Sequence, residues 1–90
     1  MLMEQMASRL NTAPEQLERE SLRLYLMHQL RMVDTELLNL TRRYGVQTIF
    51  ELDQAVAAGQ FSEATAFEDY FRLDHLEAER RTLRELLSQL

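Results

Sequence analysis

The sequence predicts an all-α protein built on a long antiparallel helical hairpin with a short connecting helix. The chain of 90 residues contains only two glycines and one proline, and each falls where a helix would begin or end. Apolar residues recur at spacings of three and four, which is the period of a helical face. No strand with alternating apolar residues precedes the helices. These observations together indicate helices separated by tight turns.

The first two expected elements are an N-terminal arm and a long helix. Residues 1–11 form the arm, most of it a short helix that is expected to fray. Thr12 and Glu15 match a capping box, in which each side chain bonds to a backbone amide near the start of a helix. The long helix is therefore expected over residues 13–44. Gly45 can end it, because glycine adopts the left-handed conformation at little cost.

The last two expected elements are a short helix and a second long one. Another capping box opens a helix over residues 49–58, and Gly59 ends it. Ser62 then caps a final helix over residues 63–89. The segments between the helices are too short to be linkers between domains. Residues 1–90 are therefore expected to form a single domain.

The long helix carries more apolar surface than one neighbouring helix can cover. Its main seam, within residues 22–44, occupies an arc of about 80°, and Leu24, Met27 and Leu38 form a weaker stripe about 100–160° away. Pairing two hairpins into a four-helix bundle would bury both second stripes. Pairing also suits a short chain without cysteines, whose core is marginal on its own. We therefore expect a homodimer with an interface formed by Leu24, Leu26, Met27, Leu30, Val33, Leu37 and Leu40.

The final helix changes its apolar side near Arg72. Leucines after this point share one face, whereas Phe67, Tyr70 and Phe71 lie nearly opposite. Aromatic side chains and arginine dominate interface energetics, and the acidic residues between them would complement a basic partner. We therefore predict a partner-binding patch of Phe67, Tyr70, Phe71 and Arg72. The alternative is that these aromatic residues form ordinary core at the turn end of the hairpin.

The N-terminal arm is a second candidate contact. Its apolar residues include Met3 and Met6, and methionine adapts well to binding surfaces. The alternative is that this short apolar arm only covers the bundle.

No motif in the sequence predicts catalysis, a cofactor or a metal site. Neither His28 nor His75 has a glutamate three residues earlier, as the metal sites of helical bundles require. Cysteines are absent, and no glycine-rich loop is present to hold a phosphate. Neighbouring carboxylates diverge from the helices, so they cannot converge on one substrate. We expect a protein that is not an enzyme.

The charge balance limits the partners. Fifteen acidic residues and ten arginines give a net charge of −5, which argues against general binding to nucleic acid backbones. No apolar run approaches the roughly 18 residues that span a bilayer, and the first residues do not resemble a signal peptide. The expected location is the cytoplasm, without membrane contact.

Several stretches resemble a known class of protein. Residues 9–17 and 20–26 have the small–Pro–Glu–x–Leu and Leu–x–x–Tyr–Leu cadence of helices in ribbon-helix-helix antitoxins. Residues 44–46, 50–53 and 67–78 resemble small helical prokaryotic proteins from toxin–antitoxin gene pairs. The ribbon strand itself is missing, which departs from the antitoxin pattern. The resemblance implies an acidic, dimeric protein that neutralises a toxin by wrapping or capping it.

Three functions are compatible with these features. The first is an antitoxin-like protein that binds a basic toxin, for example a nuclease. The second is a self-assembling structural or adaptor dimer without a toxin partner. The third is a DNA-binding regulator, which the acidic charge and the missing ribbon disfavour.

Overall fold

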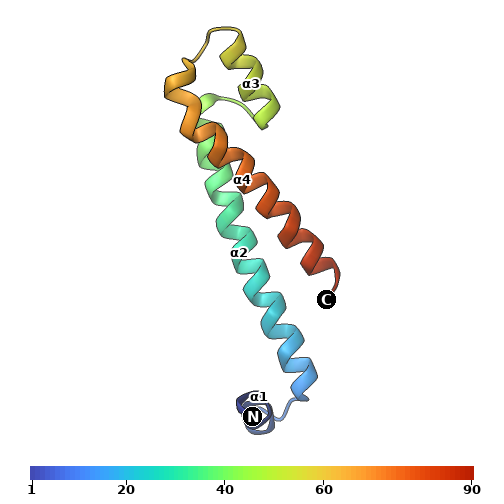
Figure 1. Cartoon of the computed structure of the whole chain (residues 1–90). Coiled ribbons are helices and arrows are strands. Elements are labelled where there is room, and N and C mark those ends of the chain that lie inside the picture. The colour runs from blue at the N-terminus through green and yellow to red at the C-terminus, as the bar shows by residue number, and fades with distance from the viewer.

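The computed structural model describes residues 1–90, apart from the side chain of Thr65. The predicted all-helical hairpin is confirmed. Two long helices lie side by side in opposite directions, a short helix covers the end where they connect, and another lies at the far end of the molecule (Figure 1). In chain order the helices are α1 (Leu2–Arg9), α2 (Pro14–Tyr44), α3 (Ile49–Ala57) and α4 (Glu63–Ser88).

The molecule is a single elongated layer. It measures 61 × 19 × 18 Å, and its two short dimensions correspond to about two helix diameters at most. The radius of gyration is 19.0 Å, whereas a compact domain of this length would have a value near 12 Å. None of the described helices is both long enough and apolar enough to cross a membrane. Over most of the hairpin, each helix therefore has only one neighbour.

Three of the helices end in the same left-handed turn. Asn11, Gly45 and Gly59 have φ angles of 57°, 65° and 80°. In each case the amide of the following residue donates a hydrogen bond to the carbonyl five residues before it, at 2.9, 3.0 and 3.0 Å. These bonds use carbonyls that the helix leaves unpaired. The two glycine ends were predicted, and the one at Asn11 was not.

The capping box predicted at the start of α2 is wrong. Ala13 is the N-cap residue, in an extended conformation, and no side chain caps this helix. Thr12 belongs instead to the turn that ends α1, because its amide donates to the carbonyl of Ala7 at 2.9 Å and its hydroxyl donates to that of Leu10 at 3.2 Å. Pro14 needs no partner at the first helical position, since it has no amide hydrogen.

The capping box at α3 is present. The Glu51 amide donates to Thr48 Oγ1 at 3.1 Å. The Glu51 carboxylate accepts in return from the amide of Gln47 at 2.7 Å, one residue earlier than the usual arrangement. At α4, the amide of Ala66 donates to the carbonyl of Ser62 at 3.0 Å. Helices α2, α3 and α4 begin and end within one residue of the bounds expected for them, whereas α1 is shorter than the expected arm of residues 1–11.

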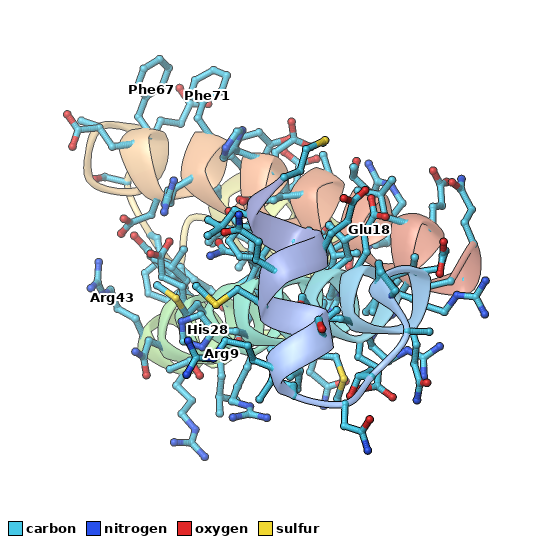
Figure 2. The ribbon with its side chains drawn as sticks, turned by 90° about the horizontal axis from the view of Figure 1, so that it is seen from below. Arg9, Glu18, His28, Arg43, Phe67 and Phe71 are labelled. Carbon is cyan, nitrogen blue, oxygen red and sulfur yellow. The ribbon has the colours of Figure 1, made fainter. Side chains whose placement is uncertain are left out.

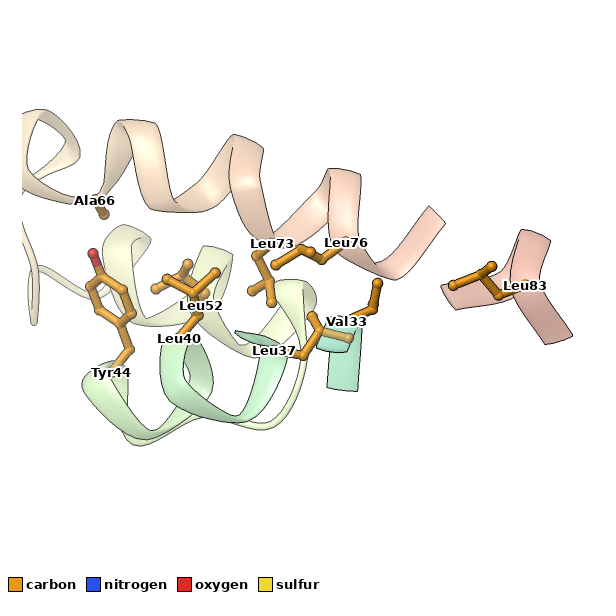
Figure 3. Close-up of a cluster of buried hydrophobic side chains, with 9 residues drawn as sticks. All are labelled: Val33, Leu37, Leu40, Tyr44, Leu52, Ala66, Leu73, Leu76 and Leu83. Atoms are coloured by element: carbon orange, nitrogen blue, oxygen red, sulfur yellow. The ribbon is translucent and has the colours of Figure 1, made fainter. Parts of the chain in front are cut away.

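The core is densest where α2, α3 and α4 meet (Figure 3). Leu52, Leu73 and Leu76 are the largest side chains that are almost completely buried. Tyr44, at the end of α2, packs with its ring edge against Phe61, and the two ring centroids are 4.9 Å apart. The buried cluster comprises Val33, Leu37, Leu40, Tyr44, Leu52, Ala66, Leu73, Leu76 and Leu83.

Most of the predicted dimer interface is used inside the chain. The seam of α2 faces α4 and packs into its leucines, so it is not available to a second copy. The physical reason is that α4 lies along this seam and offers it an apolar face of its own. Only Leu24 and Met27 of the predicted set remain exposed. The residues that pack within the hairpin are Leu26, Leu30, Val33, Leu37 and Leu40.

The half of the hairpin that lacks α3 is more open. Here α4 diverges from α2 toward its C-terminal end (Figure 1). Leu22 on α2 and Leu86 on α4 are both exposed, because no third helix covers them. Stability should therefore be concentrated at the end that contains α3.

Alanine substitutions test this gradient. Leu52→Ala should lower the free energy of unfolding by about 2–5 kcal/mol, because it leaves a cavity among three helices. Leu22→Ala should lower it by less than about 1 kcal/mol, because an exposed leucine leaves none. Urea unfolding monitored by circular dichroism measures both values. Equal losses for the two variants would contradict the proposed gradient.

Candidate partner-binding surface

An exposed aromatic pair lies at the first turns of α4. Phe67 is 61 % exposed and Phe71 is 57 % exposed. Their rings meet edge to face with centroids 4.9 Å apart, and the ring of Tyr70 approaches Phe71 at 6.0 Å. Both phenylalanines point away from the hairpin (Figure 2). Large apolar groups gathered in this way on a surface commonly mark a contact with another molecule.

The aromatic pair borders a hollow between α3 and α4, which we call the aromatic hollow. Its volume is about 360 Å³, within the range of sites that accept a side chain or a small ligand. Asp53 on α3 and Glu63 on α4 are its charged residues. Val56 and Ala66 add apolar surface between the two helices. The full lining is Asp53, Val56, Glu63, Ala66, Phe67, Tyr70 and Phe71.

The net charge of the protein is concentrated at this end. Residues 44–71 contain five acidic side chains and no basic one, whereas the other residues contain ten of each. The whole net charge of −5 therefore lies in the segment that builds the aromatic hollow. The total charge alone does not reveal this segregation, whereas a count by element does.

A hydrogen-bonded cluster joins the first turns of α4 to the end of α2. The Tyr44 hydroxyl donates to Asp69 Oδ2 at 2.5 Å, and Arg43 Nη1 donates to the same oxygen at 2.9 Å. The bond from Tyr44, followed by the influence of Arg43, lowers the pKa of Asp69 below its usual value of 3.8. Burial, together with the Asp69 carboxylate, raises the pKa of Tyr44 above 10.0. The cluster fixes the start of α4 and thereby the aromatic pair.

Two members of the predicted aromatic patch have roles within the chain. Arg72 Nε donates to Glu36 Oε2 on α2 at 2.7 Å, so its guanidinium ties α4 to α2 on the outside of the hairpin. Tyr70 is half-buried and packs against the core. Phe67 and Phe71 are therefore the members of the aromatic patch that remain more than half exposed. Phe50 on α3 is also exposed.

The second predicted contact lies far from the first. Met3 and Met6 are exposed on α1, at the opposite end of a molecule that is 61 Å long. Figure 1 shows α1 across the start of α2 and α3 at the other end. A small partner therefore cannot reach both candidate contacts on one copy of the chain. Since the net charge favours a basic partner at the aromatic end, that end is the stronger candidate.

The histidine and carboxylate side chains that the structure describes are spread over the helices. In the part of the chain that the structure describes, no three His, Asp or Glu side chains lie close enough together to hold a metal ion. His28 is exposed on α2. His75 lies on the surface of α4 with its Nε2 3.9 Å from a carboxylate oxygen of Glu79.

The fold and this surface define a class of protein: a small helical hairpin with an acidic, aromatic end. The chain belongs to the family described as "Uncharacterized protein MJ0235 family", which matches it over residues 1–90. No curated protein matches the chain, and no solved structure matches it.

The cluster of Tyr44, Asp69 and Arg43 predicts a specific pH dependence. Because the pKa of Asp69 is lowered in the folded state, its carboxylate stabilises the fold fully at any pH above the pKa that it has in the unfolded chain. This stabilisation is lost as the pH falls through the lower pKa of the folded state. Because the pKa of Tyr44 is raised, its stabilisation is complete below pH 10 and is lost at higher pH. Tyr44→Phe should therefore lower the free energy of unfolding by about 1–2 kcal/mol at neutral pH. This difference from the wild type should shrink toward both acidic and alkaline pH.

Urea unfolding from about pH 2.5 to pH 10.5 measures this difference. Tyr25→Phe is the matched control, because Tyr25 is exposed on α2 and its substitution should change little. A constant difference between wild type and Tyr44→Phe across this range would show that the hydrogen bond to Asp69 is not its source.

Proposed function

We propose that this protein is a binding module whose aromatic hollow receives a basic, amphipathic segment of another protein. One observation carries the proposal: exposed aromatic rings border an apolar hollow on the segment that holds the whole net charge. Apolar contact supplies affinity at such a surface, and opposite charge steers the partner toward it.

The hollow suggests how the partner is held. An apolar side chain of the partner fills the space beside Phe67 and Phe71. An arginine or lysine next to it reaches the carboxylates of Asp53 and Glu63. A cation can also lie over the exposed face of a phenylalanine ring. The rigid attachment of α4 to α2 keeps these groups in place, so little ordering is needed when the partner binds.

Within this class we propose an antitoxin-like role, in which the chain neutralises a basic toxin in the cytoplasm. The resemblance to antitoxin helices and the acidic binding end both support it. Blocking a partner requires only contact, so the chain acts without a catalytic group. A nuclease is one class of toxin that fits, because its own substrate is an anion and its active surface is basic.

A self-assembling structural or adaptor dimer is the second candidate. The exposed stripe of Leu24, Met27 and Leu38 on α2 favours it. A DNA-binding regulator is the third and weakest, since the arginines are balanced by an equal number of carboxylates outside residues 44–71. A mobility-shift assay on the upstream promoter at physiological salt should show no complex.

Co-expression tests the leading proposal. The product of an adjacent gene that arrests growth should be neutralised by the wild-type chain but not by the double variant Phe67→Ala/Phe71→Ala. Each lost aromatic contact should weaken binding by roughly 2 kcal/mol or more, which is at least about thirtyfold. Both residues are exposed, so the variant should keep its fold, and circular dichroism checks this.

Tyr25→Ala is the matched control, because it removes an equally exposed aromatic side chain from a distant part of α2. It should neutralise as well as the wild type. Neutralisation by the folded double variant would exclude the aromatic hollow as the binding site. Calorimetry with the purified partner should also show affinity falling as salt rises, since opposite charges are screened.

A further inference from the structure

A stripe of α2 beside the seam that packs on α4 is exposed and grooved. Leu24, Met27 and Leu38 are 68 %, 44 % and 48 % exposed. Leu30, Arg31, Asp34 and Thr35 complete a shallow groove with Met27 and Leu38. The Thr35 hydroxyl already donates to the carbonyl of Arg31 at 2.9 Å, so this groove can be covered without leaving that donor unpaired.

The order of residues along the groove is self-complementary. Reading toward the C-terminus, the positions are apolar, basic, acidic and apolar: Met27, Arg31, Asp34 and Leu38. A two-fold axis perpendicular to α2, between residues 32 and 33, places Met27 opposite Leu38 of a second copy. The same axis places Arg31 opposite the second copy's Asp34. We infer that a second copy of this chain covers this stripe, with the two α2 helices antiparallel.

The two charged groups are available for this contact. In the described part of the chain, no carboxylate lies within ion-pair distance of the Arg31 guanidinium. Asp34 has only a long contact with Arg80, at 3.9 Å, and remains 46 % exposed. Glu77 and Arg84 on α4 continue the surface beside Asp34. They supply a polar rim to an apolar centre, as protein interfaces commonly have.

The charge distribution selects the antiparallel arrangement. In a parallel pair, Arg31 would face Arg31 and Asp34 would face Asp34. The two acidic segments, residues 44–71, would also lie side by side. In the antiparallel pair the C-terminal ends of the two α2 helices are more than about 30 Å apart at 1.5 Å per residue, well beyond the screening length in physiological salt. The aromatic hollow of each copy then stays free.

Cysteine crosslinking tests the arrangement, because the natural chain contains no cysteine. Met27→Cys and Leu38→Cys are made separately, purified, mixed at tens of micromolar and oxidised. In the antiparallel dimer, position 27 of one copy lies about 16 Å along the axis from position 27 of the other, and position 38 is separated in the same way. These separations are too long for a disulfide, whereas positions 27 and 38 of different copies meet. The mixture should give roughly tenfold more crosslinked product than either variant alone.

Met32→Cys is the matched control. Met32 is also exposed, but it lies about 140° around α2 from Met27. Mixed with Leu38→Cys, it should give no more product than the single variants do. Self-crosslinking of Met27→Cys and Leu38→Cys would overturn the antiparallel arrangement. Product from the Met32→Cys mixture equal to that from the Met27→Cys mixture, or no product from any mixture, would overturn the stripe as the interface.

A charge exchange provides a second readout that leaves the apolar residues intact. Arg31→Asp should weaken the dimer, because two carboxylates then oppose each other. The double exchange Arg31→Asp/Asp34→Arg should restore most of the affinity measured by sedimentation. A double variant that dimerises no better than Arg31→Asp would contradict the facing of these two residues.

Discussion

The structure depends on one packing constraint: when only two helices pack together, each helix can bury only one apolar stripe. The seam of α2 and the leucines of α4 use most of this capacity. Because α3 adds a third helix at one end only, the interior there becomes closed around Leu52, Leu73 and Leu76. Farther from that end, Leu24, Met27 and Leu38 on α2 stay exposed.

This constraint separates the molecule into regions with different properties. The end with α3 is closed, acidic and aromatic, and the cluster of Tyr44, Asp69 and Arg43 fixes its geometry. The middle of α2 has balanced charges and an uncovered apolar stripe. The proposed partner site and the proposed contact between copies therefore occupy different surfaces. Both can be used at the same time, so that a dimer would present two acidic ends pointing in opposite directions.

The sequence predicted the helices well because their ends depend on local chemistry. Gly45 and Gly59 have no side-chain penalty in the left-handed conformation, and the hydroxyl of Thr48 caps α3 without help from distant residues. At Thr12 the same local pattern misled the prediction, since Asn11 formed a left-handed turn that used Thr12 to end α1. Two local signals competed there, and the capping rule alone could not rank them.

The apolar faces could not be assigned in this way, because that requires knowing which surfaces meet. Leu26 suits a dimer seam and a hairpin seam equally, and only the position of α4 decides between them.

Sedimentation equilibrium over a concentration series tests most directly whether the apolar surface left by the hairpin is covered by another copy. We predict a mass that rises from that of a single chain of 10.7 kDa toward twice this value. A cooperatively folded chain that keeps the monomer mass up to hundreds of micromolar would contradict this prediction, because the stripe on α2 would then be stable in contact with water.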